Sequence, residues 1–261
     1  MDKPVVISLD KQNDRNLFQR LKKSAFVVDE IREQIKELEL VKNPRLLTGP
    51  NNLKSNNLKP APDTVWIYYP WKNTLVHCLD KKNFKFLRTS RNKNLILDEE
   101  QKRLEKIRVG VAGLNVGNPG AVCLALEGDI EMKLADNDIL SLSNLNRFRA
   151  GLPDLGVNKA VLTARQIYEI NPFAKLEVFD KGISPENIEN FLIKPKIDVL
   201  VEEMDNLPLK IKIRELARDN KIPVIMVTGN SENVIIDIER FDLNPRLPLL
   251  AGYLKKEIIN E

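Results

Sequence analysis

The 261-residue sequence predicts an α/β protein whose core is a doubly wound, mostly parallel sheet with helices on both faces. Two observations support this. From residue 98 onward, short apolar runs alternate with amphipathic segments of about 10 to 15 residues, which is typical of βαβ units. Before residue 98 the alternation is absent. We therefore expect a small N-terminal accessory module at 1–97 and a Rossmann-like domain at 98–261.

The accessory module has three predicted parts. Residues 13–42 carry apolar side chains at mostly helical spacing, which indicates one or two amphipathic helices. Residues 43–63 are rich in Asn, Pro and Lys and are typical of a linker or long loop. Two short strands at 64–71 and 73–79 follow, and the single histidine, His77, is interpreted as part of the second strand.

The second domain is predicted element by element from its apolar runs. Strands are expected at 107–113, 129–136, 175–180, 197–204 and 221–229. Helices are expected at 99–106, 119–128, 158–170, 184–192 and 206–220. Because each strand is followed by a helix, the strands run parallel, and ligands of such sheets bind beyond the carboxyl ends of the strands.

Composition excludes several classes of protein. The balance of 41 basic and 37 acidic residues gives a net charge of +4, too slight to predict a nucleic-acid partner. No apolar run approaches the ~18 residues of a membrane span and the start lacks a signal-peptide pattern, so we expect a cytoplasmic protein without a membrane partner. Cys78 and Cys123 form no CxxC pair, which argues against a zinc site or a disulfide framework, and Cys123 is expected to pack on the apolar face of its helix.

The first strand-to-helix turn of the domain carries Gly113, Gly117 and Gly120. Glycines at this position let backbone N–H groups approach a phosphate, and the helix N-terminus adds positive potential. Asn115 and Asn118 stand where further glycines are expected, so the turn is equally compatible with a tight turn that binds no ligand.

Asp136 ends the next strand, 23 residues after Gly113. An acidic residue about 20 residues on is where a ribose hydroxyl is bound in dinucleotide folds, although a turn or N-cap aspartate is the alternative. Asn144, Arg147 and Lys159 follow, and an Arg fork with a Lys point charge could clamp a triphosphate. The alternative for each is a solvated charged loop.

The fourth strand of the domain ends as IDVLVEEMDN. Asp205 follows its carboxyl end and could ligate the magnesium that accompanies ATP. Strand alternation places one of Glu202 and Glu203 toward the same crevice and the other away from it. Asn206 is either a contact of this site or the N-cap of the following helix.

These stretches together resemble the ThiF/MoeB family, adenylyltransferases related to ubiquitin-activating enzymes. The matching segments are RVGVAGLNVG, LADNDILSLSNLNR, DLGVNKA, IDVLVEEMDN and KIPVIMVTG, in the family's order, and the resemblance covers roughly residues 88–242. Other segments, such as YYPW and IERFDLNPRLPLLAGYL, are similar to a bacterial branch in which this domain precedes a nitroreductase-like flavin domain.

The resemblance implies roles for individual residues. Asp136 would bind the ribose, and Asp205 would bind Mg-ATP at the reacting centre. The phosphates would be bound by Asn144, Arg147 and Lys159. The wider nucleotide site would include Gly113, Asn115, Gly117, Asp138 and Asn206. The RTSRN segment looks like an arginine pair, Arg88 and Arg91, of which Arg91 would reach the ATP site of a partner subunit in a homodimer.

The resemblance implies ATP- and Mg²⁺-dependent adenylation of a carboxylate with release of pyrophosphate. The acceptor would be a ubiquitin-like carrier, a peptide terminus or a small acid, and a nitroreductase-like domain is a further expected partner. Relatives that form a thioester or persulfide use a cysteine, but none follows Asp205 here. Two alternatives stay open: an NAD(P)-binding Rossmann oxidoreductase, and a non-catalytic ThiF-like protein used for binding or dimerisation.

Overall fold

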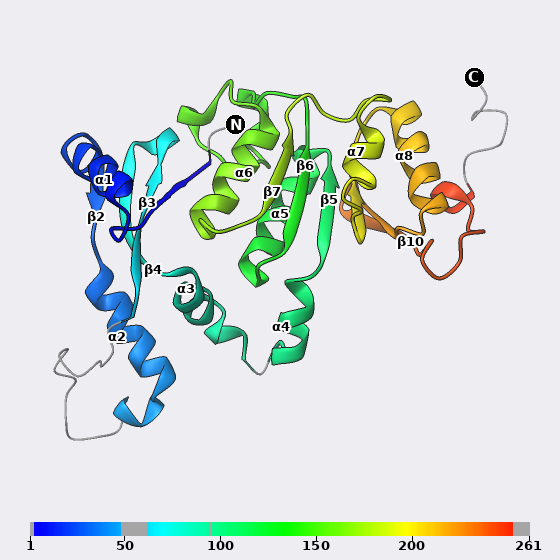
Figure 1. The fold of residues 1–261 in the computed structure, drawn as a ribbon. Helices are drawn as coiled ribbons and strands as arrows, with labels where there is room; N and C mark the ends of the chain where they lie inside the picture. The colour runs from blue at the N-terminus through cyan, green and yellow to red at the C-terminus, as the bar shows by residue number, and fades with distance from the viewer. Residues whose placement is uncertain (1–2, 48–61, 94, 253–261) are drawn as a thin grey trace. The chain divides into compact units, whose positions relative to one another are not determined.

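The computed structural model describes residues 3–47, 62–93 and 95–252 (Figure 1). Its contacts divide the chain into two units, Met1–Asp98 and Glu99–Glu261. No helix within the described ranges is long and apolar enough to cross a membrane.

The N-terminal unit is built on a four-stranded sheet in the order β1-β3-β4-β2. Strand β3 is antiparallel to β1 and β4, whereas β2 is parallel to β4. Its elements are β1 (Val5–Ile7), α1 (Gln12–Ser24), β2 (Phe26–Val28), α2 (Ile31–Lys42), β3 (Thr64–Tyr69), β4 (Thr74–Leu79) and α3 (Lys81–Arg88). Part of the predicted linker, 48–61, lies outside the described residues.

A small apolar cluster holds this unit together. Ile7, Phe18, Trp66 and Leu75 are buried in it, and α1 supplies Phe18. His77 lies in β4, as predicted, where its ring stacks on Trp66 at 4.2 Å between centroids. The sequence pattern over 13–42 predicted helix, but the short strand β2 separates α1 from α2.

The second unit contains a six-stranded sheet in the order β10-β9-β8-β5-β6-β7. Strands β5 to β9 pair in parallel, and β10 is antiparallel to β9. Its strands are β5 (Arg108–Ala112), β6 (Glu131–Ala135), β7 (Leu176–Phe179), β8 (Val199–Glu202), β9 (Val224–Asn230) and β10 (Asn233–Glu239). Its helices are α4 (Asp98–Leu104), α5 (Leu114–Glu127), α6 (Lys159–Ile170), α7 (Ile188–Leu192) and α8 (Leu207–Asp219).

Helices cover both faces of this sheet. Figure 1 shows α5 and α6 on one side and α7 and α8 on the other, which confirms the predicted doubly wound α/β class. The central strands are therefore buried on both faces: Val111 and Leu134 are fully covered on one face, and Ala112 and Ala135 are covered on the other. Burial on both faces explains why these strands read as continuous apolar runs.

Helix α5 differs most from its prediction. It begins at Leu114 rather than at 119, so the turn before it consists of Gly113, which adopts a φ of 89° as the N-cap residue. Gly117 lies inside the helix, where a Cβ would come 2.6 Å from Cγ1 of Val111. The prediction that Cys123 packs on an apolar face is wrong, because this side chain is exposed.

Candidate functional site

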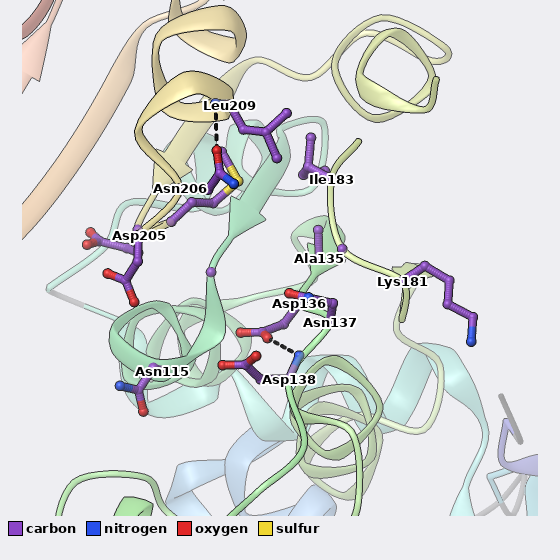
Figure 2. Close-up of a pocket in the computed structure, with 14 residues that line it drawn as sticks. Asn115, Ala135, Asp136, Asn137, Asp138, Lys181, Ile183, Asp205, Asn206 and Leu209 are labelled. Carbon is purple, nitrogen blue, oxygen red and sulfur yellow. Dashed lines mark hydrogen bonds between the residues drawn. The ribbon is translucent and has the colours of Figure 1, made fainter. Parts of the chain in front are cut away.

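A cavity of about 290 Å³ lies beyond the carboxyl ends of four parallel strands (Figure 2). Its walls come from the residues that follow β5, β6, β7 and β8. This is the position at which doubly wound sheets bind their ligands, at the point where the strand order reverses. Four carboxyl groups line it, from Asp136, Asp138, Glu203 and Asp205.

Gly113 sets how closely two walls of the cavity approach each other. Its N–H donates to the carbonyl of Ala135 at 2.9 Å. A Cβ at this position would lie 2.4 Å from the carbonyl oxygen of Glu203. Because only glycine tolerates both this contact and the positive φ, the sequence allows the N-terminus of α5 to begin directly against the end of β8.

Asp136 lies just after β6, at the N-terminus of α5. Its Oδ2 accepts from the N–H of Leu114 at 2.6 Å, and its Oδ1 accepts from the N–H of Asp138 at 2.8 Å. Burial raises the pKa of the Asp136 carboxyl above its ordinary value, although both hydrogen bonds act in the opposite direction. Each carboxylate oxygen has a further lone pair, so the group can still accept from a ligand hydroxyl.

Arg147 is exposed and lies beside the N-terminal turn of α5. With its amide oriented to satisfy both groups, Oδ1 of Asn115 accepts from Nε and Nη2 of Arg147 at 3.1 and 3.2 Å. Nη1 of Arg147 donates to Oδ1 of Asn146 at 2.8 Å. Asn115 lines the cavity, so the guanidinium borders it through this residue.

Lys159 is the first residue of α6 and is only 4% exposed. Its Nζ lies 3.0 Å from Oδ2 of Asp138, and its N–H donates to the carbonyl of the same residue. The ammonium group therefore borders the cavity through Asp138, on which it uses one of its three N–H donors.

Asn144 has a different position from the other polar residues of its segment. It is 8% exposed, and its Oδ1 accepts from the N–H and the Oγ of Ser141, both at 3.0 Å. These bonds close the short 3-10 helix Leu142–Asn144 that precedes Arg147. The side chain supports the loop and is not part of the cavity wall.

Asp205 and Asn206 lie across the cavity from Asp136 and Asp138 (Figure 2). Asp205 is exposed, whereas Oδ1 of Asn206 accepts from the N–H of Leu209 at 3.0 Å as the N-cap of α8. Within the described residues, no three His, Cys, Asp or Glu side chains are grouped closely enough to hold a metal ion. A Mg²⁺ ion bound by Asp205 would take its remaining ligands from phosphate oxygens and water.

Glu202 and Glu203 separate as strand alternation predicts. Glu203 lines the cavity, and its Oε1 accepts from the N–H of Val227 at 2.7 Å. Burial, with Glu202 as a further cause, raises the pKa of Glu203 to about 7. Glu202 is fully buried and is bound by Lys210 and Arg214.

The cavity includes residues that the sequence analysis did not single out. Lys181, Gly182 and Ile183 follow β7, and Leu209 comes from α8. The rule that ligands bind beyond the carboxyl ends of strands pointed to the segment after β7, but its composition carries no recognisable motif. Figure 2 shows the Lys181 side chain directed away from the labelled carboxylates. Arg91 belongs to the N-terminal unit, exposed on the 3-10 helix Ser90–Asn92.

The fold and the cavity define a doubly wound α/β protein with a polar, carboxylate-rich ligand site at the ends of its strands. A family model described as the ThiF family matches residues 89–231, which is more than half of the chain. The chain belongs to the ThiF family. It therefore contains a domain of the ThiF/MoeB-like adenylyltransferase type, and the predicted resemblance to this family is confirmed. The similarity to a branch with a nitroreductase-like domain stays a prediction.

Three relatives illustrate this similarity. The chain is 40% identical over 202 residues to the uncharacterized protein MT1398 of Mycobacterium tuberculosis, covering 75% of this chain and 28% of the relative. It is 31% identical to a probable molybdopterin-synthase adenylyltransferase of Porphyra purpurea, covering 52% of this chain and 37% of that protein. The solved structure of Escherichia coli tRNA N6-threonylcarbamoyladenosine dehydratase, TcdA, in complex with ATP has a TM-score of 0.52 and 25% identity, covering 55% of this chain and 60% of the other. The chain thus spans less than two thirds of the length of each.

Proposed function

We propose that the second unit binds Mg-ATP and adenylates a carboxylate, with release of pyrophosphate. The observation that carries the proposal is the arrangement of Asp136, Asn115 and Asp205 around one cavity, with Arg147 against Asn115. The ATP complex of TcdA, a relative with the same fold, supports the choice of nucleotide.

The parts of the nucleotide would be bound by different walls. The ribose hydroxyls would donate to the Asp136 carboxylate. The base would pack against the apolar side chains Ile183, Met204 and Leu209, which come from the other side of the cavity. A volume of about 290 Å³ is near the lower end of the ~300 to 1,000 Å³ of ligand pockets, so the phosphates would extend toward Arg147, outside the enclosed part.

The chemistry requires positioning and charge neutralisation rather than a general base. A carboxylate is already nucleophilic at neutral pH, and one of its oxygens forms a bond to the α-phosphorus. The bond from the α-phosphorus to the bridging oxygen breaks, and the electron pair leaves with pyrophosphate. Arg147 and Lys159 would stabilise that developing charge, and Asp205 would hold the Mg²⁺, which neutralises the phosphates when bound.

A homodimer completes the proposal through Arg91. The exposed face of α5 carries Val116, Cys123 and Leu126, of which Val116 and Leu126 are 48% and 52% exposed. Such an apolar face supports burial against a second copy. Arg91 would then act on the partner's nucleotide. Mixing Arg91→Ala with Asp205→Ala subunits tests this directly, since each mixed dimer would contain one intact site. About half of the dimers in a random mixture are mixed, so the mixture should recover about a quarter of the wild-type activity.

The proposed nucleotide is tested by equilibrium binding. The wild-type chain should bind ATP with Mg²⁺ present and should not bind NAD under the same conditions. Asp205→Asn should weaken Mg-ATP binding, whereas Asp219→Asn, an exposed aspartate at the other end of α8, should not. Binding of NAD in preference to ATP would overturn the proposal in favour of an oxidoreductase. Pyrophosphate exchange with candidate acceptors then identifies the carboxylate, which we expect to be a carrier-protein or peptide terminus or a small acid.

A further inference from the structure

A buried side chain of α5 contacts the helix that carries Lys159. Asn118 is fully buried, and its Nδ2 donates to Oγ1 of Thr163 at 2.9 Å and to Oε1 of Gln166 at 2.8 Å. Thr163, also fully buried, donates from Oγ1 to the carbonyl of Lys159 at 2.8 Å. Nε2 of Gln166 donates to the carbonyl of Arg149. Asn118 is thus connected to the backbone of Lys159 through Thr163 and to the backbone of Arg149 through Gln166.

The direction of these bonds is fixed. The Thr163 hydroxyl has a single proton, which it gives to the Lys159 carbonyl, so Thr163 accepts from Asn118. Both protons of the Asn118 amide are then used, and its Oδ1 has no hydrogen-bond partner within the described structure. Buried polar atoms are normally paired, and an unpaired acceptor opposes stability. Packing of α5 against α6 alone would be better served by an apolar side chain at 118.

We propose that Asn118 is a positioning residue for the phosphate side of the nucleotide site, an inference that rests on the proposed function. The N-terminal part of α5 bonds the Arg147–Arg149 segment twice: Asn115 accepts from Arg147, and Asn118 is joined to Arg149 through Gln166. A third connection through Thr163 fixes the first turn of α6, where Lys159 lies.

Asn118 acts through these neighbours and not on the ligand. Its side chain has no exposed surface, and it is not among the residues that line the cavity. Its loss would therefore change where the two cations lie relative to the N-terminus of α5, without removing any group that contacts the nucleotide.

The test uses the hydroxyl of Thr163. Thr163→Val keeps the shape of the side chain, removes the bond to the Lys159 carbonyl and leaves one of the two Asn118 amide protons without an acceptor. Thr163→Ser keeps the hydroxyl and is the matched control. Asn118→Ala removes the amide itself. Hydrogen exchange of the backbone amides in 145–159 reports the position of the segment, and Mg-ATP binding reports its effect on the site.

Thr163→Val and Asn118→Ala should each accelerate exchange in 145–159 by about tenfold relative to the sheet strands, and should weaken Mg-ATP binding by a similar factor. In Thr163→Ser, which keeps the hydroxyl, the exchange rate and the affinity for Mg-ATP should both stay near the wild-type values. Exchange that rises equally over the whole unit, or that stays at the wild-type rate in 145–159, overturns the positioning role. Failure of the wild-type chain to bind Mg-ATP overturns the proposed function instead, while the exchange comparison still decides whether Asn118 holds the segment.

Discussion

Two groups of acidic side chains in the second unit differ in how their charges are balanced. Around Arg214, which is fully buried, Glu202, Asp237 and Glu239 are paired with its guanidinium, and Lys210 adds a second cation. At the cavity, Asp138 is paired with Lys159, but none of the other described side chains forms an ion pair with Asp205.

This difference indicates what each group does. Each carboxylate of the cluster around Arg214 has a cationic partner within the cluster. The cluster also fixes backbone: Glu202 accepts from the N–H of Met204 at 2.9 Å, and Glu239 accepts from the N–H of Leu250. It needs no ligand. The carboxyl groups that line the cavity outnumber the one lysine, Lys181, that lines it, so a bound Mg²⁺ would favour an anionic nucleotide there.

The largest expected effect comes from breaking the complete cluster. Arg214→Met leaves Glu239 buried without its partner and Glu202 with Lys210 alone, which should lower the free energy of unfolding by about 3 to 5 kcal/mol. Urea unfolding measures this. Lys194→Met, which removes an exposed pair with Glu189, is the control and should cost about 0 to 1 kcal/mol. Equal effects of the two substitutions would remove the distinction between the clusters.

Substitutions at the cavity should show the opposite pattern, with a large effect on activity and a small effect on stability. Asp205→Ala should reduce the rate of pyrophosphate exchange by about 100-fold, because it removes the proposed Mg²⁺ ligand. Its midpoint of thermal unfolding should stay near the wild-type value because the side chain is exposed. A strongly destabilised but fully active variant would contradict the assignment.

The pair of Asp138 and Lys159 gives a smaller effect with a definite sign. If Lys159 leaves Asp138 to contact phosphate, Lys159→Met should weaken Mg-ATP binding by about tenfold, whereas Asp138→Asn should strengthen it by about threefold by releasing the cation. Calorimetric titration of both variants distinguishes the two directions. Weaker binding in both would show that the intact pair, and not the free ammonium group, is needed.

The smallest expected effect is a pH dependence of stability from Glu203. Its pKa is raised from 4.5 to about 7, so the folded state holds this proton more tightly than the unfolded state. The free energy of unfolding that this proton contributes is fully present below pH about 4.5 and decreases as the pH rises to about 7. Above that pH it no longer changes. The stability of wild type relative to Glu203→Gln should fall across this range when measured by urea unfolding at several pH values. A difference that does not vary with pH would contradict the raised pKa.

The sequence was sufficient for the order of the core elements because β5, β6 and β8 read as apolar runs, of which β5 and β6 are buried on both faces. It was not sufficient for the start of α5. Gly117 and Asn118 have low helix propensity and predicted a turn, but close packing on Val111 requires a residue without a Cβ inside the helix. Strand β10 was not predicted because Val234, Ile235 and Ile236 are consecutive apolar residues, so its sequence lacks the alternation of polar and apolar residues that marks one buried face. These three side chains and Ile238 are all more than half exposed.

The same limits apply to the site. Asp136 and Asp205 were identified because each follows a buried strand, and the structure places both at the cavity. The sequence could not show that Lys159 is paired with Asp138, since that pair depends on how the loop between β6 and α6 folds back. Cys123 was misplaced because α5 is apolar all round, so its sequence does not define a buried face.

The central claim is that Asp136, Arg147 and Asp205 bind one nucleotide at this cavity. It is tested most directly by a crystal structure of the chain with Mg²⁺ and a non-hydrolysable ATP analogue. The account predicts ribose hydroxyls hydrogen-bonded to Asp136, phosphates beside Arg147 at the N-terminus of α5, and the metal ion on Asp205. A nucleotide bound elsewhere, or one whose phosphates lie away from α5, would contradict it.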